Sequence, residues 1–529
     1  MPITGNAIGI PLLTIILGLP AAAAVLCMFV DDERAIRLIA VIAAVADFVL
    51  AAIMLVKLAV RPSGGWVFQF ADRHDWVSTL GITYWIGVDG IAAFLVALTA
   101  LIFAIGIVAS VYMIVDRVKL FMTFMLFLEA AVLGVFMSVN LFLFFVFWEA
   151  MLIPSYFLLG MWGEERRVYA TTKFVLYTVL GSFFMLVAIF YLWTQTGTLD
   201  MAGPHGLVAH PISGAAQYWL FLAFAIAFAI KMPIWPFHSW APTAYTESPI
   251  PFLVVLSGIL SKAGAFGFIR YCLPLFPEAT RAFAGTLSVL AIIGMLYAAG
   301  LALVQTDIKR LVAYASISHM NLIALGIFSL NATGLDGSTL QMVNHSVIIT
   351  GLFLAVAFIV ARSGTRMLTD MGGMGARWPI LMWVFFVFVL AGLDLPGLGS
   401  FSGEFLILAG VFRSNAWYSA IAALTVILAA WYMIRLFQRT MNGPQVVSPE
   451  AVAATADRPD RTPYQYPVVR RLISNDLLPR ELVLLVPLLA LVLYIGVQPD
   501  PVTTRLNATT NQTASLVHRS TSTVAGAAP

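Results

Sequence analysis

Residues 225–238 read Ala225-Ile-Ala-Phe-Ala-Ile-Lys231-Met-Pro233-Ile-Trp-Pro236-Phe-His238, so one lysine stands inside an apolar run and two prolines follow it. An ammonium group at the centre of a membrane helix costs roughly 2.5–3.5 kcal/mol on insertion scales. Each proline removes a backbone donor and clashes with the carbonyl four residues earlier, so we expect the helix to break here. A charge beside a broken helix at bilayer depth is typical of ion sites in transporters. This stretch therefore predicts a membrane protein that moves ions.

The composition of the whole chain also indicates a membrane protein. Of its 529 residues, 61% are hydrophobic and only 10% are charged, whereas a soluble protein carries about 25% charged residues. The two cysteines, Cys27 and Cys272, lie far apart and have no metal-binding or redox spacing. The sequence contains no glycine motif for a phosphate or a dinucleotide. We therefore expect no nucleotide, flavin, iron–sulfur cluster or metal on this chain, and no nucleic-acid partner.

Long apolar segments divide the chain into about fourteen membrane spans, at roughly 20 apolar residues per crossing. The first segment lacks a preceding basic region, so we expect a retained helix and not a cleaved signal peptide. Pro233 and Pro236 interrupt the seventh span, and Pro396 and Gly397 interrupt the twelfth. The expected limits are 7–30, 38–60, 87–115, 119–138, 140–162, 174–194, 217–235, 250–272, 283–304, 311–330, 341–361, 379–412, 416–437 and 482–498. The predicted fold class is an all-α polytopic membrane protein.

The distribution of basic residues predicts the orientation of these spans. If the N-terminus faces outside, the inside loops hold about 19 Lys and Arg residues and the outside segments about 6. This bias places both termini outside. Residues 61–86 alternate weakly and predict an outside hairpin. Residues 441–480 are rich in proline and charge and predict a segment along the inner surface, and the polar tail after Pro501 predicts a mobile end.

Ionisable residues near the middle of the spans are the candidate site residues, because a charge inside the membrane is costly and usually functional. Glu149 and Lys231 stand beside helix-breaking prolines, and Glu404 follows the break of the twelfth span. The candidates are Glu129, Glu149, Lys231, His238, Lys262, His319, His345 and Glu404. Each also has a structural interpretation. A buried Glu–Lys pair can fix helix packing, a membrane histidine can serve only as an interhelical hydrogen-bond donor, and Glu129 can simply solvate a crevice.

These residue types suit proton transfer. A buried lysine can exchange its proton when its glutamate partner moves or is screened, and histidine titrates near neutral pH without assistance. A row of Glu, Lys, Lys, His and Glu at one depth predicts an aqueous relay along the membrane plane. We expect the broken helices to connect this row to the two surfaces, although spacing alone does not give the order of the row.

Six stretches carry a specific resemblance. They are Phe147-Trp148-Glu149-Ala-Met-Leu-Ile-Pro154-Ser-Tyr-Phe-Leu-Leu-Gly160-Met-Trp-Gly163, Lys231-Met-Pro-Ile-Trp-Pro-Phe-His238-Ser-Trp240-Ala-Pro242, Lys262-Ala-Gly, Gln305-Thr-Asp307-Ile-Lys309-Arg310 through His319, Asp370-Met-Gly-Gly, and Leu395-Pro-Gly-Leu-Gly-Ser-Phe-Ser-Gly-Glu404-Phe. Together they cover about residues 85–440. In these motifs the chain resembles the antiporter-like membrane subunits of proton-pumping NADH:quinone oxidoreductase (respiratory complex I).

The resemblance implies a fold of fourteen helices in which spans four to eight and nine to thirteen are inverted five-helix repeats, with helices seven and twelve discontinuous. It implies that Glu149 pairs with Lys231 and that Lys262 relays onward. At the twelfth-helix position the L-type and N-type relatives carry Lys and the M-type carries Glu, so Glu404 argues for the M-type. One departure is that Thr243 and Tyr245 replace a loop carboxylate and imidazole of the family, with Glu247 close enough in sequence to substitute for the acid.

The resemblance also implies an organisation and an environment. The expected divisions are 1–118 for three N-terminal helices with an outside loop, 119–272 and 283–437 for the two repeats, and 438–529 for the surface loop, the last helix and the polar tail. NADH, FMN, iron–sulfur clusters and quinone are expected in partner subunits. The partners include L-type and N-type chains in the bilayer of the cell (plasma or inner) membrane.

Three functions remain open from the sequence. The first is a proton-translocating, non-redox subunit of NADH:quinone oxidoreductase, coupled to distant quinone reduction. The second is a subunit of a multi-chain cation/proton antiporter. The third is an assembly scaffold whose buried charges only fix helix register. Glu404 favours the first over the second, and charge-neutralising variants that assemble but fail to pump would exclude the third.

Overall fold

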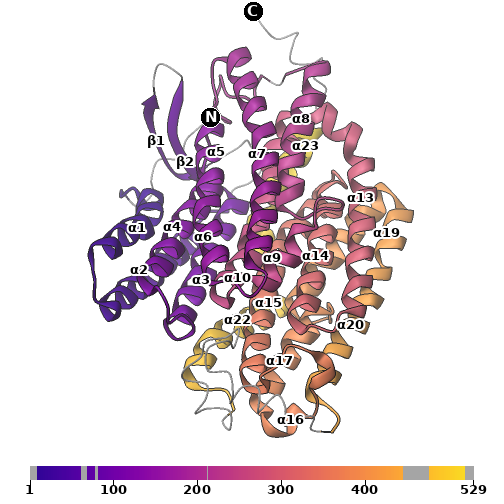
Figure 1. The fold of residues 1–529 in the computed structure, drawn as a ribbon. Helices are drawn as coiled ribbons and strands as arrows, with labels where there is room; N and C mark the ends of the chain where they lie inside the picture. Colours follow the sequence, from indigo (N-terminus) through magenta and orange to yellow (C-terminus); the bar gives the residue numbers. More distant parts are fainter. Residues whose placement is uncertain (1–8, 61–67, 78–80, 211, 445–475, 519–529) are drawn as a thin grey trace, which may run out of the picture.

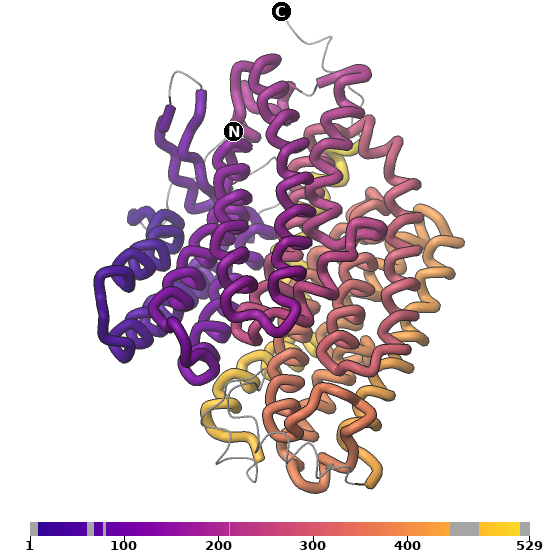
Figure 2. Tube along the Cα trace, in the orientation of Figure 1, coloured from indigo at the N-terminus to yellow at the C-terminus, as the bar shows by residue number. Residues whose placement is uncertain are grey.

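The computed structural model describes residues 9–60, 68–77, 81–210, 212–444 and 476–518. Its helices run side by side in one bundle, and the colour passes from indigo on the left to orange on the right, so the two halves of the chain lie next to each other (Figures 1 and 2). Twelve helices of the described part are long and apolar enough to cross a membrane. Two shorter apolar helices, Ala215–Lys231 and Pro379–Gly392, end at the predicted breaks, and the count of fourteen crossings stays a prediction.

The N-terminal part consists of membrane helices and one hairpin. Strands β1 and β2 pair antiparallel between α2 and α3, as expected for the outside loop. The helix of the fifth span is irregular at Met151, just after Glu149, and therefore divides into α5 and α6. The elements are α1 (Leu12–Phe29), α2 (Glu33–Lys57), β1 (Gln69–Val77), β2 (Ile82–Val88), α3 (Gly90–Met113), α4 (Val118–Met137), α5 (Leu141–Ala150), α6 (Leu152–Trp162) and α7 (Arg167–Thr196).

The predicted break of the seventh span is confirmed. Helix α8 ends at Lys231, turns follow, and α9 begins at Trp240. The eighth span consists of short α and π segments, and no sequence pattern predicts its two π turns. The elements are α8 (Ala215–Lys231), α9 (Trp240–Glu247), α10 (Ile250–Val255), η2 (Leu256–Leu260), α11 (Lys262–Gly267), η3 (Phe268–Cys272) and α12 (Leu273–Leu275).

The C-terminal half also contains long helices and one broken helix. The twelfth span divides at residues 393–398, which include Pro396 and Gly397, so this second predicted break is also confirmed. The elements are α13 (Pro277–Val304), α14 (Ile308–Ile327), α15 (Ala332–Ser363), η4 (Leu368–Asp370), α16 (Met374–Arg377), α17 (Pro379–Gly392), α18 (Gly399–Ser414), α19 (Ala416–Ala422), α20 (Leu424–Met441), α22 (Pro479–Val497) and α23 (Asp500–Val517).

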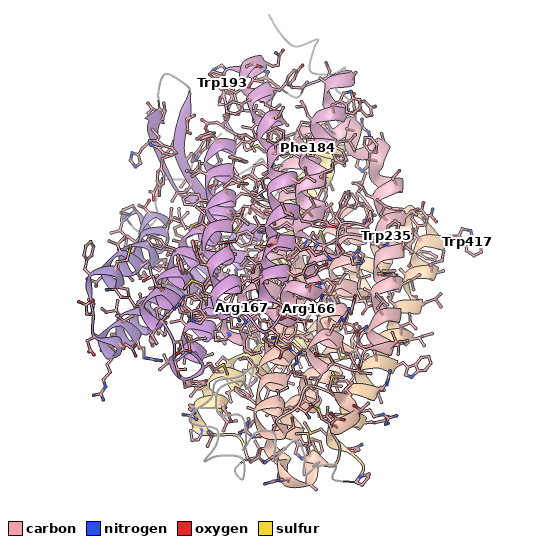
Figure 3. All side chains as sticks on the ribbon, in the orientation of Figure 1. Arg166, Arg167, Phe184, Trp193, Trp235 and Trp417 are labelled. Atoms are coloured by element: carbon pink, nitrogen blue, oxygen red, sulfur yellow. The ribbon has the colours of Figure 1, made fainter. Side chains whose placement is uncertain are left out.

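Burial separates an inner layer of helices from an outer one. In the span from Ile250 to Leu275 and in α15, every residue of the most apolar window is buried, whereas in α2, in α22 and in the span from Ala416 to Met441 only a third of that window is buried. Outer helices present large apolar side chains, as Phe184 and Trp417 do in Figure 3. Exposed apolar surface of this extent suits contact with lipid or other membrane chains.

The polar tail is ordered as far as the structure describes it, and the expectation of a mobile end after Pro501 is wrong. Residues 500–517 form α23, which packs on α3, α12, α13 and α15. Its Val502, Leu506 and Val517 are buried. Polar contacts also hold it, because Thr510 Oγ1 donates to Asp336. Most of the expected inner-surface segment 441–480 lies outside the described residues.

Candidate functional site

The break of the seventh span is held open by side chains from neighbouring segments. Trp240 Nε1 donates to the carbonyl of Ile230 at 2.9 Å, which satisfies a backbone acceptor at the end of α8. Asn321 of α14 donates to the Pro233 carbonyl at 3.2 Å and accepts from the Trp235 N–H at 3.4 Å. These bonds replace the helical bonds that the two prolines prevent. Lys231 therefore stands at the end of a fixed, interrupted helix.

Lys231 is buried among aromatic rings. Its Nζ lies 5.5 Å from the ring centre of Trp148 and 5.6 Å from that of Phe174, and it has no hydrogen-bond partner in the described part of the chain. Glu149, which is half-buried, is the opposite charge that acts on it. Among the described residues these two form no direct ion pair, so the expected contact between Glu149 and Lys231 is an attraction across a gap.

Lys262 is fully buried and has direct partners. It follows the π turn η2, and π turns are frequent at functional sites. Its Nζ donates to the Ser257 carbonyl at 2.9 Å and lies 2.7 Å from Nδ1 of His345 on α15. A Cβ at Gly264, two residues later, would lie only 2.6 Å from the Phe228 carbonyl oxygen of α8. The segment that carries Lys262 therefore packs closely on the helix that ends in Lys231.

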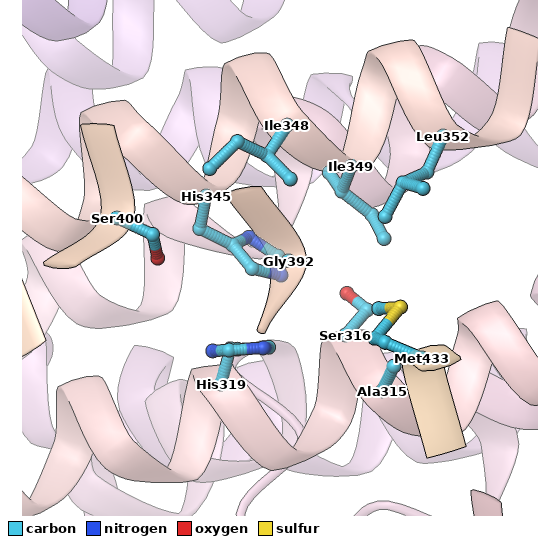
Figure 4. Close-up of a pocket in the computed structure, with 10 residues that line it drawn as sticks. All are labelled: Ala315, Ser316, His319, His345, Ile348, Ile349, Leu352, Gly392, Ser400 and Met433. Atoms are coloured by element: carbon cyan, nitrogen blue, oxygen red, sulfur yellow. The ribbon is translucent and has the colours of Figure 1, made fainter. Parts of the chain in front are cut away.

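The histidine pair continues this row from Lys262. The rings of His319 and His345 are 5.7 Å apart. Both line a cavity of about 10 Å³, together with Ser316 of α14, Gly392 at the end of α17 and Ser400 of α18 (Figure 4). One water molecule needs about this volume. The cavity thus reaches from the histidines to both arms of the broken twelfth span.

Amide side chains of α15 hold the second break. Gln341 Nε2 donates to Ser400 Oγ at 2.6 Å, and the Asn344 amide donates to the Gly399 carbonyl. Glu404 is buried one turn beyond Ser400 on α18. The carboxyl group of Asp394, which stands in the break itself, is near enough to act electrostatically on that of Glu404. The structure therefore brings Glu149, Lys231, Lys262, His319, His345 and Glu404 into one row of packed segments.

Two predicted residues lie apart from this row. Glu129 of α4 is fully buried, and its carboxyl neighbour is Asp47 of α2, on the outer side of the bundle. His238 lies in the turn after α8, with its ring 5.3 Å from that of Tyr297 and the charge of Lys173 nearby. It belongs to the seventh-span break but makes no contact with Lys262 or the histidine pair.

Several residues of the site escaped the sequence reasoning. Asp47 and Asp394 both interrupt apolar runs, a signal that could have found them. The amide residues that hold the breaks, Asn321, Gln341 and Asn344, are polar residues within membrane spans and carry a weaker signal of the same kind. Glu247, considered as a substitute acid, accepts a hydrogen bond from the Arg166 N–H at 2.9 Å and so caps the start of α7.

Other buried charged residues form direct ion pairs, which hold neighbouring segments together. Arg270 meets Asp89 at 2.6 Å, and Lys309 meets Glu164 at 2.8 Å. Over the described ranges, no group of three or more His, Cys, Asp or Glu residues is arranged to hold a metal ion. The chemistry available in the row is proton exchange among carboxyl, amine and imidazole groups.

A family model described as NADH:quinone oxidoreductase/Mrp antiporter, TM, matches residues 138–429, which include both breaks and all of the row. The chain belongs to this antiporter-like family. The resemblance inferred from the motifs is therefore confirmed. The NADH-quinone oxidoreductase subunit M of Rickettsia prowazekii (strain Madrid E) is 36% identical over 493 residues, which cover 93% of this chain and 95% of that protein.

Solved structures of the antiporter-like family show the same fold. A chain of respiratory complex I from Thermus thermophilus with bound NADH is 30% identical, with a TM-score of 0.83, and the match covers 96% of this chain and 100% of that chain. A chain of the Mrp complex from Dietzia sp. DQ12-45-1b is 19% identical, with a TM-score of 0.80 and coverage of 97% and 98%. The latter likeness concerns the fold alone. The predicted polytopic helical fold class is confirmed.

Proposed function

We propose that this chain is a proton-translocating membrane subunit of an NADH:quinone oxidoreductase. The observation that carries the proposal is the 2.7 Å contact between Lys262 and His345 beside a water-sized cavity that leads to the second break. Relatives named subunit M match over nearly the whole chain, which supports the oxidoreductase complex over the antiporter. The subunit itself performs no redox step, and its role is that of a translocase.

In the proposed relay, the proton passes along the row from Lys231 to Lys262, then to His345 and finally to Glu404. A proton on Lys231 is stabilised by the Glu149 charge, so movement or screening of Glu149 releases it. Lys262 accepts the proton and passes it to the imidazole of His345, which is already within hydrogen-bonding distance. A water molecule in the cavity can carry it on toward Glu404. His319, His238 and Glu129 are assigned supporting positions: His319 along the cavity, His238 at the first break and Glu129 outside the main row.

The proposal extends to partners and setting. NADH, FMN, iron–sulfur clusters and quinone belong to partner subunits, which include L-type and N-type chains. The chain spans the cell membrane with both termini outside. We also propose that residues 119–272 and 283–437 are inverted repeats, since each contains one broken helix held by amide side chains from a neighbouring helix. Residues 1–118 and 438–529 flank them.

Replacement of Lys231 by alanine tests the proposal. Removing the ammonium leaves Glu149 without its opposite charge and removes one proton carrier, so proton pumping by the assembled complex should be lost, with much of the coupled NADH:quinone turnover. Pumping is measured in sealed vesicles. The matched control is Lys57→Ala, at the exposed end of α2. Wild-type pumping in a fully assembled Lys231→Ala complex would reject the mechanism.

The subunits that co-purify with this chain test the choice of complex. Flavin and iron–sulfur subunits in stoichiometric amount are the expected result. Purification with other membrane chains alone would favour the cation/proton antiporter. Variants that lack one of the buried charges, assemble normally and do not pump protons would exclude the hypothesis that the chain is only an assembly scaffold.

A further inference from the structure

Asp394 occupies an unusual backbone position at the second break. It lies two residues after the end of α17 and has a φ of 62°, in the left-handed region. Many helices end in this conformation, usually with glycine or asparagine, and aspartate tolerates it better than most residues. The turn therefore explains why a small polar residue stands here. It does not explain a carboxyl group that points into the protein.

The Asp394 carboxyl group is buried without a donor. The residue is 6% exposed, and neither carboxyl oxygen has a hydrogen-bond donor among the described residues. The carboxyl group of Glu404 on α18, which is 4% exposed and whose Oε2 also has no hydrogen-bond partner among the described residues, is near enough to interact with it electrostatically. The buried Tyr432 of α20 lies near enough to interact electrostatically with both. By contrast, the buried carboxylates Asp89 and Glu164 each have a basic partner.

Two carboxyl groups can hydrogen-bond to each other only if one carries a proton, because an ionised carboxylate is an acceptor alone. Two adjacent negative charges in a site of this kind repel each other strongly, and such pairs share a proton. The pair also stands next to the water-sized cavity. Gly392, two residues before Asp394, and Ser400, one turn before Glu404, both line it.

We propose that Asp394 and Glu404 form one proton-sharing unit at the end of the row, with Asp394 as a second proton acceptor. The inference rests on the proposed function. In the step concerned, an N–H bond of the protonated His345 breaks and an O–H bond forms on the carboxyl pair, through the exchange of a proton with a cavity water. The imidazole becomes neutral, the pair becomes singly or doubly protonated, and no electrons are transferred.

Two substitutions of Asp394 distinguish its proposed role as a proton acceptor from a role in forming the turn. Asparagine and glycine both accept the left-handed conformation, so Asp394→Asn and Asp394→Gly keep the backbone. Asparagine keeps the size and the hydrogen-bonding capacity but cannot exchange a proton. We expect both variants to slow pumping about tenfold, the effect of a mismatch of one pKa unit between donor and acceptor. Asp336→Asn, a carboxyl group that contacts Thr510 outside the row, is the matched control and should pump normally.

Pumping and coupled turnover are measured in vesicles with the whole complex assembled, alongside Glu404→Gln and Lys231→Ala. Normal pumping in both Asp394 variants, with Glu404→Gln impaired, would overturn this inference and leave the proposed function intact. Normal pumping in Glu404→Gln and Lys231→Ala would reject the proposed function itself.

Infrared difference spectroscopy gives a readout that needs no Asp394 variant to assemble. A shared proton predicts that replacing Glu404 by glutamine changes the carboxylic acid C=O band of the wild-type complex. The band is either shifted, with the proton left on Asp394, or lost, because the like charge that kept a proton on the pair is gone. A band in Glu404→Gln that is unchanged from the wild type would overturn the pair, since the two groups would then not interact.

Discussion

At the scale of single residues, the two buried lysines differ in what surrounds them. Lys262 has a carbonyl oxygen and an imidazole nitrogen within 2.9 Å, so its amine is held in place. Lys231 has only aromatic faces around its amine and an attraction to Glu149 across a gap. The fixed amine of Lys262 suits proton transfer to a fixed neighbour. The amine of Lys231, which has no hydrogen bonds among the described residues, gains or loses its proton when the nearby charge of Glu149 moves. The first lysine of the row is therefore the one suited to gating.

Glu404 should be needed as a titratable group, not merely as a polar one. Glutamine keeps its size and hydrogen-bonding capacity but cannot take up or release a proton, whereas aspartate can. We expect Glu404→Gln to impair proton pumping more than Glu404→Asp, measured as vesicle acidification at equal amounts of assembled complex. Equal and mild effects of the two replacements would mean that the residue only packs.

How much of the site could be predicted depends on the range of each interaction. Glu149, Lys231 and Glu404 could be found because a charge beside a proline or glycine break is visible within a few residues. The contact of Lys262 with His345 joins residues 83 positions apart, so local sequence could not give it. Asp47 and Asp394 interrupt apolar runs in the same way, and Asp394 lies two residues before Pro396, yet neither is among the candidates chosen from the sequence. Only packing shows that each meets a second carboxyl group.

At the scale of elements, both broken helices depend on amide groups supplied by a neighbouring helix. Proline and glycine predicted where the helices stop, but they do not determine what replaces the lost hydrogen bonds. Asn321 of α14 does this at the first break, and Gln341 and Asn344 of α15 do it at the second. The two π turns of the eighth span have no proline and were invisible for the same reason, since long-range packing determines them.

A glycine on α13 gives a test of the first break. A Cβ at Gly294 would collide with the Asn321 amide and lie 3.1 Å from Cβ of Trp235. We expect Gly294→Ala to displace Asn321, destabilise the protein by about 1–3 kcal/mol and slow pumping. Thermal unfolding and vesicle acidification are the measurements.

Gly285→Ala, on the same helix with nothing within 4 Å of its Cβ, is the matched control. Alanine favours a helix over glycine, so this variant should be as stable as the wild type or slightly more so. If both variants behave alike, Asn321 does not hold the break.

At the scale of the whole molecule, the basic residues of the loops predict the orientation in the membrane. Asp75 of the hairpin and Asp116 before α4 are exposed and lie on opposite sides in this scheme. We expect cysteines introduced singly at these positions to react with an impermeant thiol reagent from opposite faces of sealed vesicles, Asp75→Cys from outside and Asp116→Cys from inside. Cys27 and Cys272 are buried and would be replaced first. Reaction of both from one face would contradict the predicted topology.

The last helix has a consequence for how the protein is made. Residues of α23 are translated after all the other described helices, yet its backbone meets Gly90 at the start of α3, and the Val517 carbonyl accepts a hydrogen bond from Arg281 of α13. The bundle is thus closed by residues that leave the ribosome only after every other described helix. A stop codon after Gln498 would remove Val502, Leu506 and Val517, each worth roughly 1.5–3 kcal/mol on burial. Such a truncated chain should be inserted but degraded, which a pulse-chase experiment would show, and survival at the full-length rate would refute it.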